Sequence, residues 1–181
     1  MNTMYKKVEI EISKGDIATQ DGIDAVVNAA NAQLRTGGGV AGAIHSAAGP
    51  MLYDECRSLA PISPGEAVIT KAYELPNKFV IHCLGPVYGR DKPEDKLLSK
   101  SYSNALKLAE ENKISSIAFP ALSTGAFGYP IKEATEITFN TILAEVPKLN
   151  HLQKLKFVLH SESDLKIYES VFRDLSKKNQ A

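Results

Sequence analysis

Strand-like and helix-like patterns alternate along the chain. In residues 5–12, Val8, Ile10 and Ile12 fall on one face and polar residues on the other, which predicts a half-buried strand near the edge of a sheet. Residues 25–30 form a short apolar run, which favours a strand buried on both faces. Further strands are predicted over residues 67–73, 78–84, 115–122 and 155–161.

Helical periodicity fills the intervals between these strands. The clearest case is residues 93–112, where apolar side chains recur every three or four residues behind a first-turn proline. Other helices are predicted over residues 40–48, 50–59, 130–146 and 165–175, and residues 176–181 are expected to fray.

This alternation predicts an α/β fold in three layers, with a mixed or mainly parallel sheet between helices on both faces. The sequence shows no internal repeat, low-complexity tract or linker, so residues 1–181 are expected to form a single domain. Ligands of such sheets bind at the carboxyl ends of the strands. Loops that directly follow strands are therefore the places to look for function.

The first such loop is residues 14–18. Gly15 and Asp16 can form a polar turn in which Asp16 caps the following residues. The same carboxylate could accept a hydrogen bond from an exocyclic amine such as that of adenine. Both readings stay open from the local sequence.

The second loop, residues 28–45, joins a buried strand to a helix of small residues. Gly37, Gly38 and Gly39 allow a backbone to approach a ligand closely, and the helix that follows presents free N–H groups to an anion. The spacing is neither that of a dinucleotide-binding G-x-G-x-x-G motif nor that of a Walker loop. A plain flexible connector is the alternative.

The third loop, residues 121–130, lies between a core strand and a helix opened by Pro130. Residues 123–126 offer hydroxyl groups and consecutive backbone N–H groups, which favours a nest for phosphate. Phe127 stands between small residues, so its ring is free to cover a ligand. A tight turn with a core phenylalanine is the alternative.

Charge and composition narrow the function classes. The chain has 21 Lys and Arg residues against 21 Asp and Glu residues, so its formal charge is zero. A broad basic face for nucleic acid is therefore not expected. No apolar run has the length of a membrane span, and no signal-peptide pattern is visible. Two cysteines cannot form a disulfide framework, which favours a reducing cytoplasm.

The remaining reactive residues give weaker signals. The four histidines and two cysteines lack metal-ligand spacing, so no metal site is predicted. His82 and Cys83 lie within a predicted core strand, and both are expected to be structural. Ser123 lacks the G-x-S-x-G elbow of serine hydrolases. Asp54 and Glu55 are expected to be solvated.

Taken together, these loops resemble the macrodomain family, most closely its MacroD-like branch. The matching segments are GDI (15–17), DAVVNAAN (24–31), GGGVAGAIHSAAG (37–49), GEAVITKAYELPNKFVIHCLGP (65–86), STGAFGYP (123–130) and KIYESVF (166–172). The resemblance implies a three-layer macrodomain fold that binds ADP-ribose. It also implies hydrolysis of mono-ADP-ribosyl proteins or of O-acetyl-ADP-ribose by cleavage of an ester at the distal ribose.

The resemblance also assigns roles to residues. Asp16 and Ile17 would contact adenine. His160 would lie beside the same base, at the position where the family has an aromatic ring. Asn31 would bind the distal ribose next to the scissile bond. The diphosphate and distal ribose would be held by Gly38, Gly39, Val40, Ala41, Ser123, Thr124, Gly125, Ala126 and Phe127.

One departure from the family pattern bears on catalysis. The MacroD-like pattern has Asp after GGGV, where this chain has Ala41. That Asp is the usual candidate for placing the attacking water, so its absence weakens the case for strong hydrolysis. Asn31 and the substrate's own diphosphate would then orient water, with His45, one helical turn from Ala41, as a possible helper or a structural hydrogen-bonding group.

We therefore expect a hydrolase without a cofactor, with a non-catalytic ADP-ribose reader as the alternative. A nucleic-acid module that uses the same nucleotide pocket is a third and weaker reading. The expected partners are ADP-ribose, its esters and mono-ADP-ribosylated proteins, and the protein is expected to be a monomer.

Overall fold

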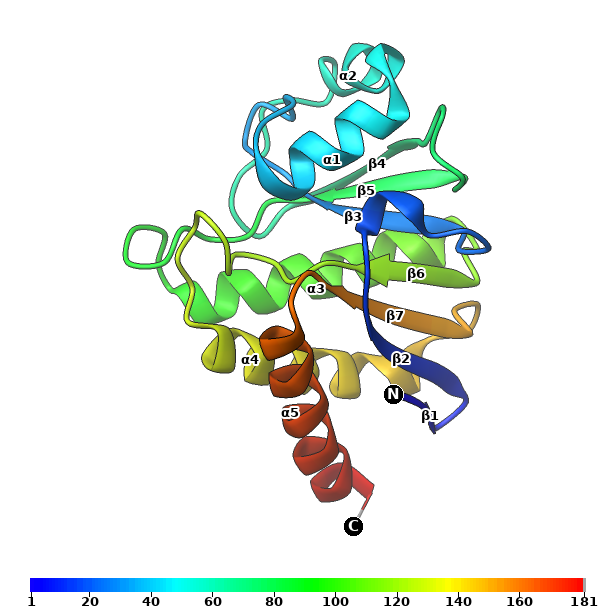
Figure 1. Ribbon diagram of the computed structural model, residues 1–181, viewed down its shortest axis with the longest axis vertical. Coiled ribbons are helices and arrows are strands. Elements are labelled where there is room, and N and C mark those ends of the chain that lie inside the picture. The colour runs from blue at the N-terminus through cyan, green and yellow to red at the C-terminus, as the bar shows by residue number, and fades with distance from the viewer. Residues whose placement is uncertain (181) are drawn as a thin grey trace.

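The computed structural model describes residues 1–180 of the chain (Figure 1). The strands are β1 (Asn2–Tyr5), β2 (Val8–Lys14), β3 (Ala25–Ala29), β4 (Ala67–Lys71), β5 (Phe79–Cys83), β6 (Ser116–Phe119) and β7 (Lys154–Leu159). The helices are α1 (Gly39–Ala48), α2 (Pro50–Cys56), α3 (Glu94–Glu111), α4 (Ile131–Glu145) and α5 (Glu162–Gln180), with 3-10 turns η1 (Ile17–Thr19) and η2 (Val146–Lys148).

The seven strands form one mixed sheet in the order β1-β2-β7-β6-β3-β5-β4. The five inner strands run parallel, and β1 and β4 pair antiparallel at the two edges. The expected mixed sheet is confirmed. Because the inner strands are parallel, their carboxyl ends meet at one edge of the sheet, on the left in Figure 1.

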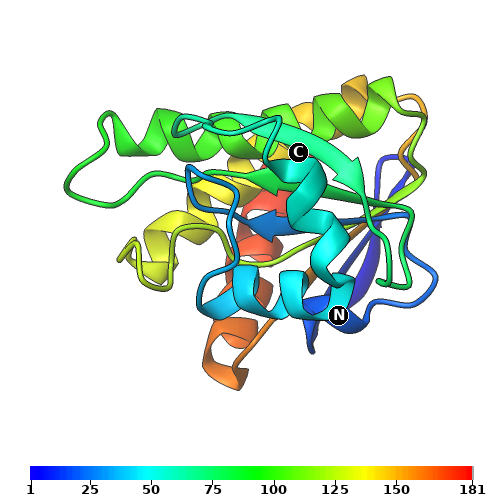
Figure 2. The ribbon, with the colours of Figure 1, turned by 90° about the horizontal axis from the view of Figure 1, so that it is seen from above.

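Helices cover both faces of the sheet, as expected for three layers. In Figures 1 and 2, α1 and α2 lie on one side of the sheet, and α3, α4 and α5 lie on the other. Alternation along each strand supplies the two cores. In β3, Val27 packs in the core under α3, α4 and α5, while its neighbour Val26 packs in the core under α1 and α2.

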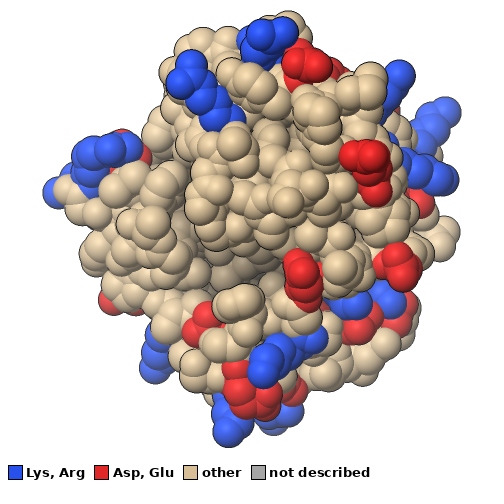
Figure 3. Space-filling model, turned by 45° about the horizontal axis from the view of Figure 1, so that its top comes forward, with Lys and Arg blue, Asp and Glu red and all other residues tan. Residues whose placement is uncertain are grey.

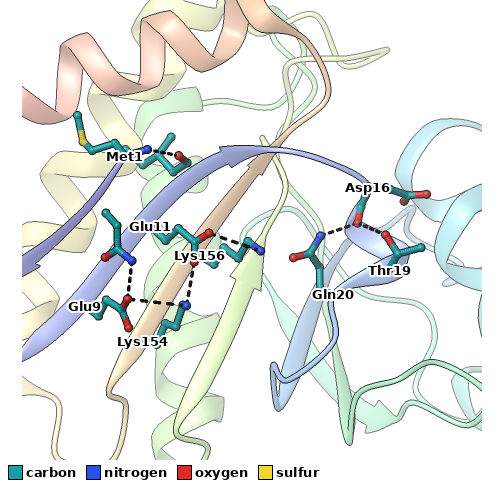
Figure 4. A network of polar contacts seen from close by, with 10 residues as sticks. Met1, Glu9, Glu11, Asp16, Thr19, Gln20, Lys154 and Lys156 are labelled. Carbon is teal, nitrogen blue, oxygen red and sulfur yellow. Dashed lines mark hydrogen bonds and ion pairs between the residues drawn. The ribbon is translucent and has the colours of Figure 1, made fainter.

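Charged side chains support one inner pair of strands. Lys154 on β7 lies 2.8 Å from the carboxylate of Glu11 and 3.8 Å from that of Glu9, both on β2 (Figure 4). Lys156 also pairs with Glu11, at 3.7 Å. These ion pairs hold the polar side of β2, which explains why glutamates alternate with its buried isoleucines.

The N-terminal strand differs from the expectation. Instead of one strand over residues 5–12, the chain forms a hairpin in which β1 takes the edge and β2 lies one place inside it. Lys6 in the turn has φ of 55°. Lysine is not a typical residue for that conformation, so the turn left no signal in the sequence.

The C-terminal helix also extends further than expected. Residues 176–180, expected to fray, continue α5, and Ala181 lies outside the described residues. Asn179 donates its side-chain amide to the carbonyl oxygen of Leu175 at 2.8 Å, and Lys177 and Lys178 suit a helix C-terminus. Across residues 1–180, none of the helices combines the length and the hydropathy that a membrane crossing needs.

Candidate functional site

The N-terminus of α1 is open at the carboxyl edge of the sheet. Gly38 is the N-cap residue and has no side chain to satisfy the first N–H groups. Gly39 has φ of 55°, a conformation that glycine adopts without steric cost. The N–H groups of Gly39, Val40 and Ala41 precede the first α-helical hydrogen bond and point away from the helix. Such a terminus favours an anion.

The loop before α1 lies tightly against the helix. A Cβ atom on Gly42 would overlap the carbonyl oxygen of Gly37, so only glycine allows this approach. In the same loop, Asn31 donates Nδ2–H to the carbonyl oxygen of Arg35 at 2.8 Å, and its Oδ1 accepts the Arg35 N–H at 2.9 Å. The side chain of Asn31 is therefore held in one orientation.

The loop after β6 offers a second group of backbone donors. Within residues 1–180, the N–H groups of Thr124, Gly125, Ala126 and Phe127 donate to no acceptor of the protein. Ser123 has φ of 65°, which turns the chain sharply at the start of this series. Consecutive free N–H groups in a turn form a concave site for an anion.

The turn itself is closed by two backbone bonds. The Gly128 N–H donates to the carbonyl oxygen of Gly125 at 3.0 Å, and the Tyr129 N–H donates to that of Ser123 at 2.8 Å. Ser123 is buried, and its Oγ, which has no partner among the described residues, packs directly on Gly85. A side chain at position 85 would displace the start of this loop.

Asp16 and Ile17 follow β2 at the same edge. Oδ1 of Asp16 accepts the Ala18 N–H at 2.9 Å, so the expected cap is present. Its carbonyl oxygen is bound by Thr19 and Gln20, while the carboxylate points away from both of them (Figure 4). Ile17 is buried beneath, and the carboxylate remains exposed for a ligand.

His160 and Phe127 complete the set of residues at this edge. His160 directly follows β7, and its side chain is exposed. Phe127 is half-buried and packs against the core under α1 and α2. The Phe127 carbonyl oxygen accepts the Tyr88 N–H at 2.9 Å, and Tyr88 packs on Tyr129 with 4.8 Å between ring centroids. The loop after β5 therefore supports the loop after β6.

His45 lies in the second half of α1. Its ring centroid is 6.3 Å from that of His82, and its Nε2 has no partner among the described residues. Burial lowers the pKa of His45, which favours the neutral ring. This position makes His45 part of the interior under α1.

His82 is a satisfied core histidine, as expected. Its Nδ1 accepts from the side-chain amide of Asn28 at 3.0 Å, and its Nε2 lies 2.9 Å from Oγ1 of Thr70. The Thr70 hydroxyl donates to the Lys71 carbonyl oxygen, so its oxygen accepts from His82. Burial lowers the pKa of His82 to about 3 and raises that of the neighbouring Cys56 to about 11. Both groups are uncharged near neutral pH.

Cys83 is also structural, because complete burial raises the pKa of its thiol. Glu55 differs from the expectation of a solvated side chain: its carboxylate accepts the hydroxyl of Tyr73 at 2.6 Å and the N–H of Lys71 at 3.1 Å. Asp54 is exposed and lies 3.7 Å from Arg57. Within residues 1–180, no group of three metal-ligating side chains is close enough to hold an ion.

The structure thus brings most of the candidate residues to one edge of the sheet. The two loops with free N–H groups follow β3 and β6, which are neighbours in the sheet, and Asp16 and His160 follow the paired strands β2 and β7. Neither the 31–34 segment nor the 121–130 loop carries a charged side chain. Figure 3 shows a hollow near the centre of one face, surrounded mostly by uncharged atoms.

Sequence reasoning missed Gly85 and Asn28. Gly85 supports Ser123 by lacking a side chain, and Asn28 binds the buried His82 from the end of β3. Asn28 was visible as a polar residue in an apolar strand, but its partner is 54 residues away. Nothing in the local sequence distinguishes Gly85 from an ordinary turn glycine.

Comparisons with known proteins agree with this geometry. Residues 27–138 match the family model for the Macro domain. An O-acetyl-ADP-ribose deacetylase of Klebsiella pneumoniae is 46% identical over 166 residues, which cover 89% of this chain and 94% of that protein. A macro domain-containing protein of Chlorobaculum tepidum is 46% identical over 167 residues, which cover 92% and 96%.

Solved structures show the same likeness. A variant of the Oceanobacillus iheyensis macrodomain with ADPR superposes with a TM-score of 0.93 at 38% identity, over 98% of both chains. The Trypanosoma brucei macrodomain in complex with ADP-ribose gives a TM-score of 0.83 at 38% identity, over 89% of this chain and 68% of that one. This chain belongs to the macro domain family.

Proposed function

We propose that this protein binds ADP-ribose and hydrolyses an acyl ester at its distal ribose. Its substrates are O-acetyl-ADP-ribose and proteins that carry mono-ADP-ribose on an acidic residue. The observation that carries the proposal is the meeting of two sets of free backbone N–H groups at one sheet edge, next to the fixed side chain of Asn31. The relatives named O-acetyl-ADP-ribose deacetylase support the reaction.

In this proposal the nucleotide lies across the carboxyl ends of the strands. Asp16 accepts from the adenine amine, with the Ile17 backbone and the His160 ring against the same base. The diphosphate lies between the N-terminus of α1 and the 123–127 loop, where backbone N–H groups hold its charge. The distal ribose then reaches Asn31 and the ring of Phe127.

In the proposed reaction, water attacks the acyl carbon, and the bond between that carbon and the ribose oxygen breaks. The proton of the water passes by way of the diphosphate to the departing ribose oxygen. Asn31 orients the water or the ribose through its remaining amide hydrogen and lone pair. Positioning is the main source of acceleration. A general base contributes about 10²–10⁴-fold where one is present.

Ala41 bears on the rate of hydrolysis and on the alternative function, binding of ADP-ribose without cleavage. Ala41 is in the first turn of α1 and is buried, and its methyl group cannot act as a base. The absence of a carboxylate there favours slow hydrolysis, and in the limit a reader that binds ADP-ribose without cleaving it. We place the hydrolase first because the relatives at 42–46% identity bear the deacetylase name.

Binding and release are measured together to separate the two functions. Calorimetry with ADP-ribose is run beside a gel assay for loss of the label from a protein that is mono-ADP-ribosylated on acidic residues. Binding with release of label supports the hydrolase, and binding without release supports the reader. Absence of binding contradicts both.

Two variants test the mechanism. Ala41→Asp is expected to raise turnover because a carboxylate in the first turn of α1 supplies a base and suits the helix N-terminus. Asn31→Ala is expected to lower turnover because it removes the orienting amide. Asn179→Ala, at the exposed end of α5, is the matched control and should behave like the parent. Equal turnover by parent, Ala41→Asp and Asn31→Ala would rule the mechanism out.

A further inference from the structure

A cavity lies between α1, α2 and the loop that joins β3 to α1. Its volume is about 660 Å³, which is within the range of roughly 300–1,000 Å³ typical of ligand sites. We call it the α1–α2 cavity. Its walls include Arg35 and Thr36 from the loop, His45 and Ser46 from α1, and Pro50 and Tyr53 from α2.

The α1–α2 cavity is connected to the proposed catalytic residue through one backbone. Arg35 lines the cavity, and the same residue exchanges two hydrogen bonds, of 2.8 and 2.9 Å, with the side chain of Asn31. Thr36 then leads directly to the glycines at the start of α1. The loop that holds Asn31 therefore forms one wall of the cavity, so the cavity lies on the distal-ribose side of the proposed site.

The walls have a definite chemical character. Arg35 is exposed and is the only charged side chain among the lining residues, while Tyr53 and Pro50 supply apolar surface. The carboxylate of Glu74 packs against Gly49, which also lines the cavity. A ligand with a carboxylate is thus favoured near Arg35 and disfavoured near Glu74.

His45 forms part of the cavity wall and is 7% exposed. Its Nε2 is shielded from solvent, so this atom does not reach a ligand in the cavity. The chemical preference of the cavity therefore follows from its charged lining residue, Arg35.

We propose that the α1–α2 cavity receives the polypeptide next to the ADP-ribosylated residue and that it prefers acidic segments. The proposal rests on the function proposed above, because it needs ADP-ribose in the main site. An acetyl ester is too small to extend past the distal ribose and fill this volume, whereas a polypeptide continues in both directions from the modified residue. The acidic preference follows from Arg35 at the end nearest Asn31.

The test compares two ligands that differ only in the polypeptide. Free ADP-ribose and an acidic peptide that carries ADP-ribose through a hydrolysis-resistant amide linkage each compete with fluorescent ADP-ribose. The parent is expected to bind the conjugate about tenfold more tightly than free ADP-ribose. Ser46→Trp fills the cavity from an exposed position of α1 and is expected to abolish this advantage while retaining the affinity for free ADP-ribose.

Two further variants separate charge from shape. Arg35→Glu is expected to make the protein prefer a neutral peptide conjugate over the acidic one, a change of about fivefold in their affinity ratio. Lys107→Trp on α3, an exposed position on the opposite side of the sheet, is the matched control and should bind both ligands like the parent.

The results of these binding assays distinguish between a polypeptide and a nucleotide as the occupant of the α1–α2 cavity. Equal affinity of the parent for free ADP-ribose and the conjugate would overturn the proposal. So would a second ADP-ribose per chain that Ser46→Trp displaces, because the occupant would then be a nucleotide. Failure to bind ADP-ribose in either form would instead refute the function of the main site.

Discussion

Replacing Gly42 with alanine adds one methyl group where α1 touches the loop before it. The new Cβ would overlap the carbonyl oxygen of Gly37, a backbone atom that has no rotamer to move aside. To restore ordinary contact, the loop must shift by roughly 1 Å. Gly37 lies two residues after Arg35, whose backbone holds the side chain of Asn31 through two hydrogen bonds, so this shift also moves Asn31.

Two terms set the expected loss of stability. Overpacking of this kind costs about 1–3 kcal/mol. Alanine in a helix interior gains about 1 kcal/mol over glycine. The free energy of unfolding of Gly42→Ala should therefore fall by about 0–2 kcal/mol, which leaves the protein folded.

The effect on activity should be larger than the effect on stability. A displacement of about 1 Å in a positioning group can cost roughly 100-fold in rate. Single-turnover release of ADP-ribose from O-acetyl-ADP-ribose measures this rate, and urea unfolding measures the stability.

Ala43→Gly is the matched control. It removes a methyl group from the adjacent helical position and is expected to lower the free energy of unfolding by about 1 kcal/mol without touching the loop. Its turnover should equal that of the parent. If Gly42→Ala becomes more stable and hydrolyses as fast as the parent, the contact between α1 and the loop does not position Asn31.

Three further predictions concern electrostatics and local stability. Burial lowers the pKa of His82 to about 3, so between that pH and about 6.5 the unfolded chain binds one more proton at this residue than the folded chain does. The contribution of His82 to the free energy of unfolding should therefore fall by about 1.4 kcal/mol per pH unit as the pH drops through this window. Urea unfolding at several pH values should show a shallower slope for His82→Gln. The affinity for ADP-ribose should change by less than about threefold between low and high salt, because backbone N–H groups hold the diphosphate; a steep salt dependence would indicate a basic surface instead. Glu110→Gln should lower the free energy of unfolding by about 1 kcal/mol, because the Glu110 carboxylate accepts the N–H groups of Asn150, His151 and Leu152, while Glu111→Gln, exposed one residue away, should leave it unchanged.

The layered fold was predictable because buried strands and amphipathic helices have distinct periods. Val26 and Val27 lie next to each other and enter opposite cores, which is what a run of apolar residues in an inner strand indicates. The hairpin at Lys6 was not predictable, because its turn lacks the glycine or asparagine that marks such a conformation. The extent of α5 depended on hydrogen bonds such as that of Asn179, which periodicity does not report.

The site residues were predictable where glycines and the position of a loop after a strand indicate a ligand-binding loop. Gly37 to Gly39 and residues 123–126 lie in the loops that follow β3 and β6, so parallel pairing was enough to bring these loops to one edge. The place of His45 depended on tertiary packing, because residues on the inner and outer sides of α1 look alike in a helix of small residues. Gly85 and Asn28 depended on partners that are remote in sequence.

The most direct test of the proposed function is the release of acetate and ADP-ribose from O-acetyl-ADP-ribose by the parent and by Asn31→Ala. We expect the parent to release both products in equal amounts, and Asn31→Ala, still folded and still binding ADP-ribose, to release them much more slowly. Equal rates for the two proteins, or no release by the parent beyond the uncatalysed reaction, would contradict it.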